Sequence, residues 1–544
     1  MGRNDKVIIF LFLVFCTFSI QAQNRYVVYF PDKSDTKFSI DRPLEFLSQN
    51  AVDRRLKSDF PISEEDFPVS QKYLDSLDKY TVPYFYTSRW LNAALVEVES
   101  SQIDIIKDKL FVTSYELVAP GARYSVTPSE ANRSYTANDP ASSVLNSVTQ
   151  VNMLNADAMH SDGYNGSGLW IAVFDAGFNG VNNSSAFGHL FQNNQLINTE
   201  DLVRGGKDVF LSDDHGTQAL SCISANYNNQ VIGTGYGADI SLYITEDPRD
   251  EYKIEEYNWV IAAEKADSAG VDIISSSLGY DAFFDDAAMN YSISQLDGET
   301  AIITIGAEKA SERGILVVSS SGNEFNLQVW DLMSFPADGK NVLSVGSVKS
   351  DRTKSNFSLG GPTADGRIKP EVVALGSSTT VIDNDGRITT SSGTSFSCPL
   401  IAGFAAGLWQ ANPDLTNIEL RQLIMDSSSQ SNNPDNLLGY GIPNYNVAMG
   451  NILGLGDTNQ DQVEIYPNPL TDNFLKINFG QAAFYNELTF NLYNSQGQLI
   501  VSLHEQNVLS DSILELELPY LDKGIYILTF VGMENHKGIK LLKF

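Results

Sequence analysis

The chain has 544 residues, of which 42% are hydrophobic and 19% are charged. This composition is that of a globular protein, and the length suggests three or so folding units of ~100–200 residues each. The formal net charge of −31 argues against a nucleic-acid partner and against a protein that binds anionic lipid. The charge suits a soluble exported protein but does not identify a function.

A targeting segment is predicted at residues 1–22. Two basic residues, Arg3 and Lys6, precede an apolar stretch from Val7 to Ile20, and Gln21-Ala22-Gln23 offers a small-residue cleavage site. The apolar stretch is shorter than an ordinary membrane span, and no other segment reaches ~18 uninterrupted apolar residues. We expect a signal peptide that is removed at this site and no stable membrane span; an uncleaved anchor is the alternative.

The cysteines do not form a disulfide framework. Cys16 lies in the predicted signal peptide, which leaves only Cys222 and Cys398. A core of this size needs no disulfides, and two buried thiols are the preferred interpretation. A single bridge between the two remains the alternative.

Residues 23–120 are predicted to form a small α+β unit. The expected strands and helices of this unit are Tyr26 to Phe30, Trp90 to Val98 and a strand through Val118, with helices at Pro43 to Leu56 and Ser101 to Leu110. Residues 121–147 are rich in Ser, Thr, Asn, Ala and Pro without periodicity. They are interpreted as an exposed linker that carries a processing site.

Residues 148–452 alternate short apolar strands with helices. This alternation predicts an α/β domain of three layers, with a mostly parallel sheet covered on both faces. The expected strands are Leu169 to Phe174, Ile240 to Ile244, Val271 to Ile274, Ile315 to Ser319 and Val342 to Val345, and the expected helices are His215 to Asn226, Ile254 to Ala269 and Glu299 to Arg313. A Gly, Asp and Asn-rich linker at 453–462 and a small all-β sandwich at 463–544 complete the chain.

A serine at the start of a helix is the first candidate for catalysis. Ser395 stands in Gly393-Thr394-Ser395-Phe396-Ser397-Cys398-Pro399, ahead of an apolar run. Free backbone N–H groups at a helix N-terminus favour developing negative charge. Pro399 is expected in the first turn, where its missing N–H costs little. Alone, the segment would be an ordinary helix start.

A base and a group that orients it are available. His215 stands just before a helical stretch, from which it could project into a cleft. Asp175 ends a strand of the predicted sheet, and chemistry in open parallel sheets gathers beyond the carboxyl ends of the strands. Asp175 alone would be interpreted as a helix cap or an Asx-turn. The four histidines interpreted as surface or core residues are His160, His189, His504 and His536.

Asn323 supplies a neutral donor. An apolar strand from Ile315 runs into a loop of small residues that ends in this carboxamide. A carboxamide can stabilise an oxyanion, whereas a carboxylate cannot. An ordinary turn residue is the alternative.

These four motifs resemble those of the subtilisin-like serine proteases of peptidase family S8, and the resemblance covers residues 148–450. The triad residues also follow the chain order of that family, Asp…His…Ser. The motifs that carry the resemblance are Asp175-Ala176-Gly177, His215-Gly216-Thr217, Ser277-Leu278-Gly279, Gly322-Asn323 and Gly393 to Pro399. Asp-Ala-Gly departs from the more usual Asp-Thr/Ser-Gly. The carboxylate is retained, so we expect a local difference in hydrogen bonding and retained catalysis.

The resemblance implies a role for each residue. Ser395 would be the nucleophile, His215 the general base and Asp175 the group that orients the imidazole, while Asn323 would line the oxyanion hole. The two backbone walls of the substrate pocket would be Ser277, Leu278, Gly279 and Ser320, Ser321, Gly322. No cofactor is required in the family, and relatives often bind structural calcium, although the sequence assigns no metal ligand.

The flanking units carry resemblances of their own. Residues 23–120 are similar in position and element order to the propeptides of subtilisin-like zymogens; a permanent accessory domain is the alternative. The C-terminal motifs Tyr466-Pro467-Asn468-Pro469, Leu492 to Gln498, Lys523 to Tyr526 and Lys540 to Lys543 resemble the type A sorting domain of type IX secretion. A carbohydrate-binding module is the alternative for residues 463–544.

Together these expectations describe a secreted or cell-surface serine endopeptidase of a Gram-negative bacterium. It would be a monomer that is made as a zymogen and acts on protein or peptide substrates. Its other partners would be its own propeptide and the type IX secretion machinery. One alternative is a catalytically inactive adhesion protein on the same fold. Another is a serine-carboxyl peptidase, which would have an acid as base and Asp at the oxyanion position; His215 and Asn323 argue against it.

Overall fold

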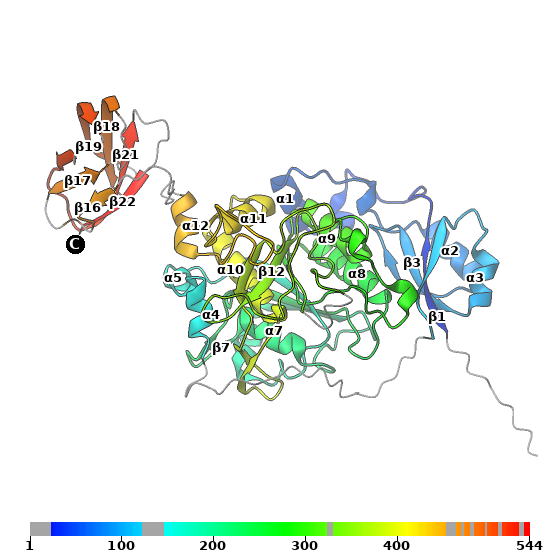
Figure 1. The fold of residues 1–544 in the computed structure, drawn as a ribbon. Helices are drawn as coiled ribbons and strands as arrows, with labels where there is room; N and C mark the ends of the chain where they lie inside the picture. Colours follow the sequence, from blue (N-terminus) through cyan, green and yellow to red (C-terminus); the bar gives the residue numbers. More distant parts are fainter. Residues whose placement is uncertain are drawn as a thin grey trace, which may run out of the picture. The chain divides into compact units, whose positions relative to one another are not determined.

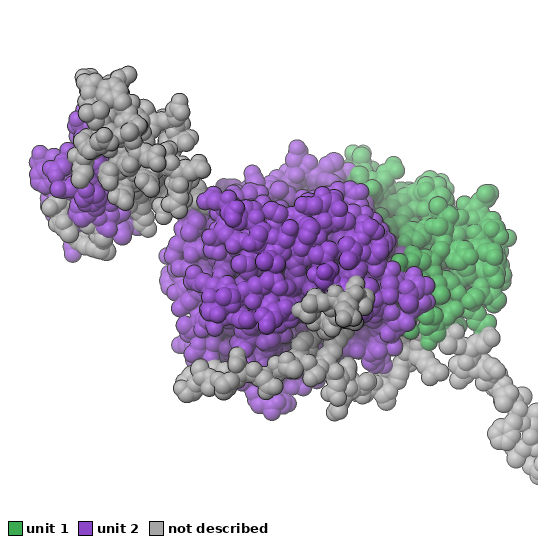
Figure 2. Space-filling model, viewed as in Figure 1, with its two compact units in different colours: residues 1–42, 63–128, 252–254 green, residues 43–62, 129–251, 255–544 purple. Residues whose placement is uncertain are grey.

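The computed structural model describes residues 23–121, 146–323 and 330–452, and residues 464–543 apart from short gaps. The predicted signal peptide, the linker at 453–462 and most of the linker at 121–147 lie outside the described residues. Contacts divide the chain into two compact units, of which the smaller holds residues 1–42, 63–128 and 252–254 (Figure 2). No helix in the described ranges has both the length and the apolar character that a membrane crossing needs.

The smaller unit is an antiparallel sheet covered by two helices. The strands lie in the order β2-β3-β1-β4, and Figure 1 labels β1 and β3 together with the helices α2 and α3. Their bounds are β1 Asn24–Tyr29, β2 Tyr84–Ser88, β3 Ala93–Val98 and β4 Ser114–Ala119, and the helices are α2 Gln71–Lys79 and α3 Ser100–Ile106. Apolar side chains of both helices pack with those of the central strands in one cluster. The α+β class is as predicted, although α2 and β2 were not foreseen.

The larger unit is built on a seven-stranded parallel sheet in the order β13-β12-β11-β10-β5-β9-β6. The strands are β5 Trp170–Asp175, β6 Leu196–Asp201, β9 Asp239–Ile244, β10 Ile273–Ser276, β11 Leu316–Ser320, β12 Leu343–Val348 and β13 Val372–Leu375. Inner strands such as β5 and β11 are buried along nearly their whole length, as parallel strands covered on both faces are, whereas the edge strand β6 is largely polar.

Helices cover both faces of this sheet, because successive side chains of a strand point to opposite faces. Val173 of β5 belongs to the core cluster that also holds residues of α7 (His215–Ser224) and α10 (Thr394–Ala411). The next residue, Phe174, instead meets Trp259 of α8 (Ile254–Ala269) edge-on, with ring centroids 5.3 Å apart. The predicted three-layer fold is therefore confirmed.

The C-terminal residues form two facing sheets. One sheet has the order β16-β17-β20 and the other β19-β18-β21-β22. The strands are β16 Glu464–Tyr466, β17 Phe474–Asn478, β18 Phe484–Asn494, β19 Leu499–Leu509, β20 Leu514–Glu517, β21 Gly524–Val531 and β22 Gly538–Lys543. Leu475 of the first sheet and Phe490 of the second lie in one buried cluster, which makes this part the expected all-β sandwich.

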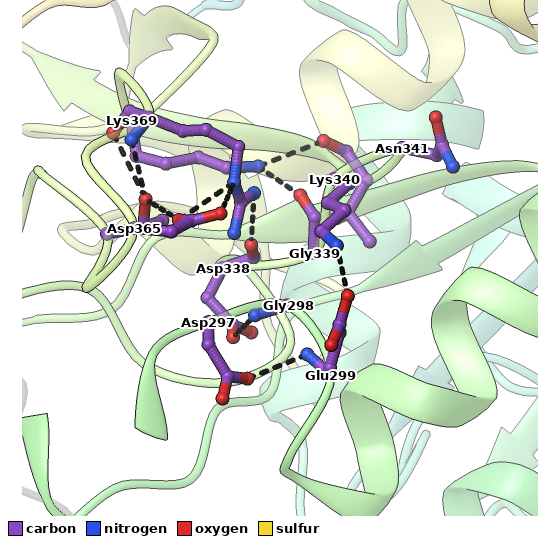
Figure 3. Close-up of polar contacts among 12 residues, drawn as sticks. Asp297, Gly298, Glu299, Asp338, Gly339, Lys340, Asn341, Asp365 and Lys369 are labelled. Carbon is purple, nitrogen blue, oxygen red and sulfur yellow. Dashed lines mark hydrogen bonds and ion pairs between the residues drawn. The ribbon is translucent and has the colours of Figure 1, made fainter. Parts of the chain in front are cut away.

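A buried lysine ties the start of β13 to the loop before β12 and to α11 (Asn417–Asp426). Lys369 Nζ donates to the carbonyl oxygen of Gly339 at 2.6 Å (Figure 3) and pairs with Glu371 at 2.8 Å. Arg421 of α11 donates to the same carboxylate at 2.6 Å. Burial lowers the pKa of Lys369, so its charge depends on these partners.

Replacing this lysine tests how much the buried network stabilises the domain. Lys369→Met leaves Glu371 with one cationic partner fewer, and breaking a buried pair costs about 3–5 kcal/mol of unfolding free energy. Lys340→Met is the control, since its side chain is 44% exposed and an exposed ion pair contributes about 0–1 kcal/mol. Denaturant unfolding in a Ser395→Ala background measures both, and equal losses would contradict the assignment.

Candidate active site

The loop after β5 lies against the first turn of α7. A Cβ on Gly216 would strike the carbonyl oxygen of Gly177 and come within 2.9 Å of Asp175 Cβ. Only glycine therefore lets this turn approach the strand end so closely. The approach brings His215 Nδ1 to 2.8 Å from Asp175 Oδ1.

Both partners of this hydrogen bond are fixed by their own neighbours. Asp175 is fully buried, and its Oδ1 also accepts from the backbone N–H of Ala176 at 2.8 Å. The backbone N–H of His215 donates to Asp213 Oδ1 at 2.7 Å, which satisfies a free donor at the start of α7. The His215 ring is 9% exposed and its centroid lies 5.8 Å from that of Phe396. The imidazole is thus placed next to the residue that follows Ser395.

Ser395 is the second residue of α10, and the position of Pro399 in this helix differs from the prediction. Because α10 begins at Thr394, Pro399 is its sixth residue and not part of the first turn. Its missing N–H would otherwise donate to the carbonyl oxygen of Ser395. Ser277 Oγ donates to that oxygen instead, at 2.9 Å. The loop after β10 thereby supplies the hydrogen bond that proline removes.

The hydroxyl of Ser395 also contacts Ser277. Ser395 is 5% exposed, and its Oγ donates to the carbonyl oxygen of Ser277 at 3.4 Å. Ser277 therefore makes two hydrogen bonds with Ser395. Its side chain donates to the Ser395 carbonyl oxygen, and its own carbonyl oxygen accepts from the Ser395 hydroxyl.

Asn323 is oriented by the start of α10. Its Oδ1 accepts from the backbone N–H of Thr394 at 2.9 Å and from Thr394 Oγ1 at 3.1 Å. A backbone N–H can only donate, so this contact assigns the oxygen and the nitrogen of the carboxamide. Asn323 Nδ2 is then the donor that remains on the other branch of the carboxamide. Thr394 was not foreseen as a positioning residue, although it stands within the Gly-Thr-Ser motif.

The two predicted substrate segments leave neighbouring parallel strands. Ser277, Leu278 and Gly279 follow β10, while Ser320, Ser321 and Gly322 end or follow β11, and the two strands pair in register. A third segment joins them: the backbone N–H of Ser334 donates to Ser321 O at 3.1 Å, and Phe335 and Tyr280 exchange two backbone hydrogen bonds. This third segment has no motif, so sequence reasoning missed it.

Other candidate residues take structural roles. Cys222 and Cys398 are both free and buried, so the alternative of a disulfide is wrong and the interpretation as buried thiols is confirmed. Burial raises the pKa of Cys398 to about 12, which keeps the thiol protonated. His160 is partly buried, with Nε2 3.0 Å from Thr234 O. Within the described residues, no group of His, Cys, Asp or Glu side chains could hold a metal ion, so no calcium ligand is assigned.

The parallel sheet and the polar site at its carboxyl end are typical of α/β enzymes. A profile for the subtilase family matches residues 166–441, just over half of the chain. The chain therefore belongs to the subtilase family and is a serine endopeptidase. A profile for the Bacteroidota peptidase S8 propeptide domain matches residues 25–134, and one for the secretion system C-terminal sorting domain matches residues 464–543.

Curated relatives agree with this assignment. The chain is 28% identical to subtilisin E of Bacillus subtilis (strain 168) over 307 residues, which cover 55% of this chain and 69% of that protein. It is 25% identical to the serine protease AprX of the same organism over 358 residues, covering 60% and 76%. Among solved structures, MycP1 from Mycobacterium smegmatis matches with 20% identity and a TM-score of 0.43, covering 56% of this chain and 84% of that one.

The hydrogen bond from Ser277 to the carbonyl of Ser395 can be tested by deleting one hydroxyl. Ser277→Ala leaves a buried carbonyl without this donor, and we expect the free energy of unfolding to fall by about 1–3 kcal/mol. Ser224→Ala is the matched control, because the buried Ser224 Oγ has no hydrogen-bond partner within the described residues. Thermal or denaturant unfolding would contradict the proposed role if the two variants lost the same stability.

Proposed function

We propose that Asp175, His215 and Ser395 form the catalytic triad of this endopeptidase. The observation that carries the proposal is the 2.8 Å hydrogen bond between His215 Nδ1 and the buried Asp175. That bond leaves Nε2 as the nitrogen that can exchange a proton with the nucleophile. The His215 ring lies beside Phe396, so the nucleophile of α10 is a near neighbour of the base.

In the proposed reaction Ser395 Oγ turns from the carbonyl of Ser277 toward His215 and attacks the scissile carbonyl carbon. His215 Nε2 takes the hydroxyl proton and then gives it to the leaving amine, so that the peptide C–N bond breaks and an acyl-enzyme remains. Water attacks the acyl-enzyme with His215 as base, and the proton returns to Ser395 when the acid product leaves. Asp175 holds the imidazole tautomer and stabilises the imidazolium at each step.

The oxyanion would be stabilised by two donors. The backbone N–H of Ser395 lies in the first turn of α10, where helical N–H groups have no partner within the helix. Asn323 Nδ2 is available because Thr394 already engages Asn323 Oδ1. Both donors are fixed before the reaction, which is the condition under which such a pair lowers the barrier.

The substrate would bind as an extended strand. Ser277, Leu278 and Gly279 on one side and Ser320, Ser321 and Gly322 on the other end two neighbouring strands of the sheet. We propose that they form the walls of the primary specificity pocket, and that the substrate main chain pairs with the backbone of one of these segments.

We also propose how the enzyme is made and exported. Residues 1–22 act as the signal peptide, and residues 23–120 are a propeptide that restrains the enzyme until a cut within 121–147 releases the catalytic domain at 148–452. After the 453–462 linker, the sorting domain at 463–544 directs passage through the type IX secretion machinery to the cell surface or beyond. The matches to a propeptide domain and to a sorting domain support this sequence of events.

Removing the nucleophile tests the triad. Ser395→Ala deletes the hydroxyl that would form the acyl-enzyme, so we expect loss of casein hydrolysis and of labelling by a fluorophosphonate. His504→Ala is the control, since His504 lies in the C-terminal sandwich and bonds to Thr489. Undiminished hydrolysis by Ser395→Ala would refute the triad. If the unmutated, folded protein showed no hydrolysis, the adhesion alternative would be supported.

Removing the carboxamide tests the oxyanion hole. We expect Asn323→Ala to lower kcat by ~10²–10³, the effect found for the corresponding subtilisin asparagine, with little change in KM. Thr394→Ser keeps the backbone donor and the hydroxyl that hold Asn323, and it should retain most activity. A loss in Asn323→Ala confined to KM would mean that the residue binds substrate and does not stabilise the transition state.

A further inference from the structure

One segment of the propeptide match does not fold with the rest of that region. Residues 43–62 interrupt the smaller unit between β1 and α2, and they group with the larger unit (Figures 1 and 2). Their helix α1 (Gln49–Lys57) starts with Ser48 as N-cap. The contacts of this helix lie at the amino end of the parallel sheet.

Two consecutive arginines of α1 share one buried carboxylate. Arg55 donates twice to Asp267, at 2.9 Å and 2.8 Å, and Arg54 donates to the same carboxylate at 2.6 Å. Arg55 is 1% exposed and Asp267, in α8, is fully buried. Bidentate guanidinium–carboxylate contacts are geometrically specific, and breaking such a pair in a buried place is costly.

One of the two arginines, Arg54, also makes hydrogen bonds to the backbone near the start of two strands. Arg54 also donates to the carbonyl oxygen of Val271 at 2.5 Å, just before β10, and to that of Arg313 at 2.9 Å, just before β11. Arg313 directly follows the last residue of α9 (Ile302–Glu312). Cations are favoured at helix C-termini because carbonyl groups there lack helical partners.

The catalytic domain is shaped to receive α1. Gly270 and Gly314 both have positive φ, and a Cβ on either would collide with the segment, at Asn50 and at Ser58 respectively. Ser48 adds two hydrogen bonds of 2.8 Å, to the carbonyl oxygens of Ser268 and Ala269 at the end of α8. The fit therefore depends on backbone shape as well as on charge.

The receiving surface is remote from the proposed catalytic serine. Lys57 Nζ lies 4.9 Å from the ring centroid of Trp409, near the end of α10, and donates to Pro413 O at 2.7 Å. Ser395 is at the other end of the same helix. At 1.5 Å per residue, Trp409 and Ser395 are ~21 Å apart along the helix axis.

We propose that residues 43–62 are an anchor that holds the propeptide on the catalytic domain from the end opposite the active site. The anchor is a binding determinant independent of the catalytic cleft, so it would persist after the linker is cut. Release of the propeptide then requires that the Arg54–Asp267–Arg55 contact be broken or that the anchor be digested. This inference rests on the proposed cut within residues 121–147.

Binding can be measured without catalysis. A recognition site for a specific protease is placed within residues 121–147 of full-length Ser395→Ala protein, the linker is cut, and the two pieces are separated by size-exclusion chromatography. We expect the pieces to co-elute, and the Arg54→Ala/Arg55→Ala variant to bind at least ~100-fold more weakly, as expected for a broken buried pair. Lys107→Ala/Lys109→Ala is the matched control, because it removes two exposed positive charges from the same propeptide region.

The outcomes separate this inference from the proposed function. Separation of the two unmutated pieces, or equal binding by the arginine variant and the control, would overturn the anchor, whatever the activity of the uncut enzyme. If the arginine variant does not fold, Asp267→Asn gives the same test from the catalytic side, since it keeps the shape of the side chain and removes its charge. We expect at least ~10-fold weaker binding for that variant.

Discussion

The close contact between the end of β5 and the first turn of α7 is the constraint on which the site depends. Gly216 allows it, because any side chain there would meet Gly177 and Asp175. Once the backbones touch, the carboxylate at the end of the strand and the imidazole at the start of the helix are within hydrogen-bonding distance. The parallel sheet supplies the other half of the geometry, since all its strands deliver their carboxyl ends to one edge.

Helix α10 connects the two ends of the domain. Its first turn holds Ser395 and orients Asn323 through Thr394, while its last turn packs under Lys57 of the anchor. Pro399 interrupts the hydrogen bonding of the first turns, and Ser277 replaces the missing donor. Ser395 is therefore held by the loop after β10 as well as by its own helix, which favours a fixed geometry for the proposed nucleophile.

Much of this could be predicted from sequence, and the reasons are local. Strands such as β5 and β9 are short apolar runs, and Asp175, His215 and Ser395 each stand at a recognisable end of a strand or start of a helix. The edge strand β6 was missed because Leu196–Asp201 is largely polar, as an edge that faces solvent allows. Pro399 was misplaced because the first residue of a helix is poorly determined by sequence.

Contacts between residues that are not neighbours in the chain could not be predicted in this way. Ser334 reaches the second substrate segment through a backbone hydrogen bond, which any residue type could make. Arg55 and Asp267 are 212 positions apart, and the sequence around either residue does not indicate that the other is its partner.

The buried charges at the two ends of the parallel sheet differ in their surroundings and in the tasks we propose for them. At the amino end of the sheet, the charged side chains of the Arg54–Asp267–Arg55 group and of the Lys369–Glu371–Arg421 group are joined by short hydrogen bonds. Such groups specify one arrangement, because every displaced partner leaves a charge buried without compensation. At the carboxyl end, buried Asp175 is hydrogen-bonded to the imidazole of His215, the group that we propose gains and loses a proton. With the proposed anchor and the proposed triad, the domain would hold its propeptide at one end while the other end changes charge during catalysis.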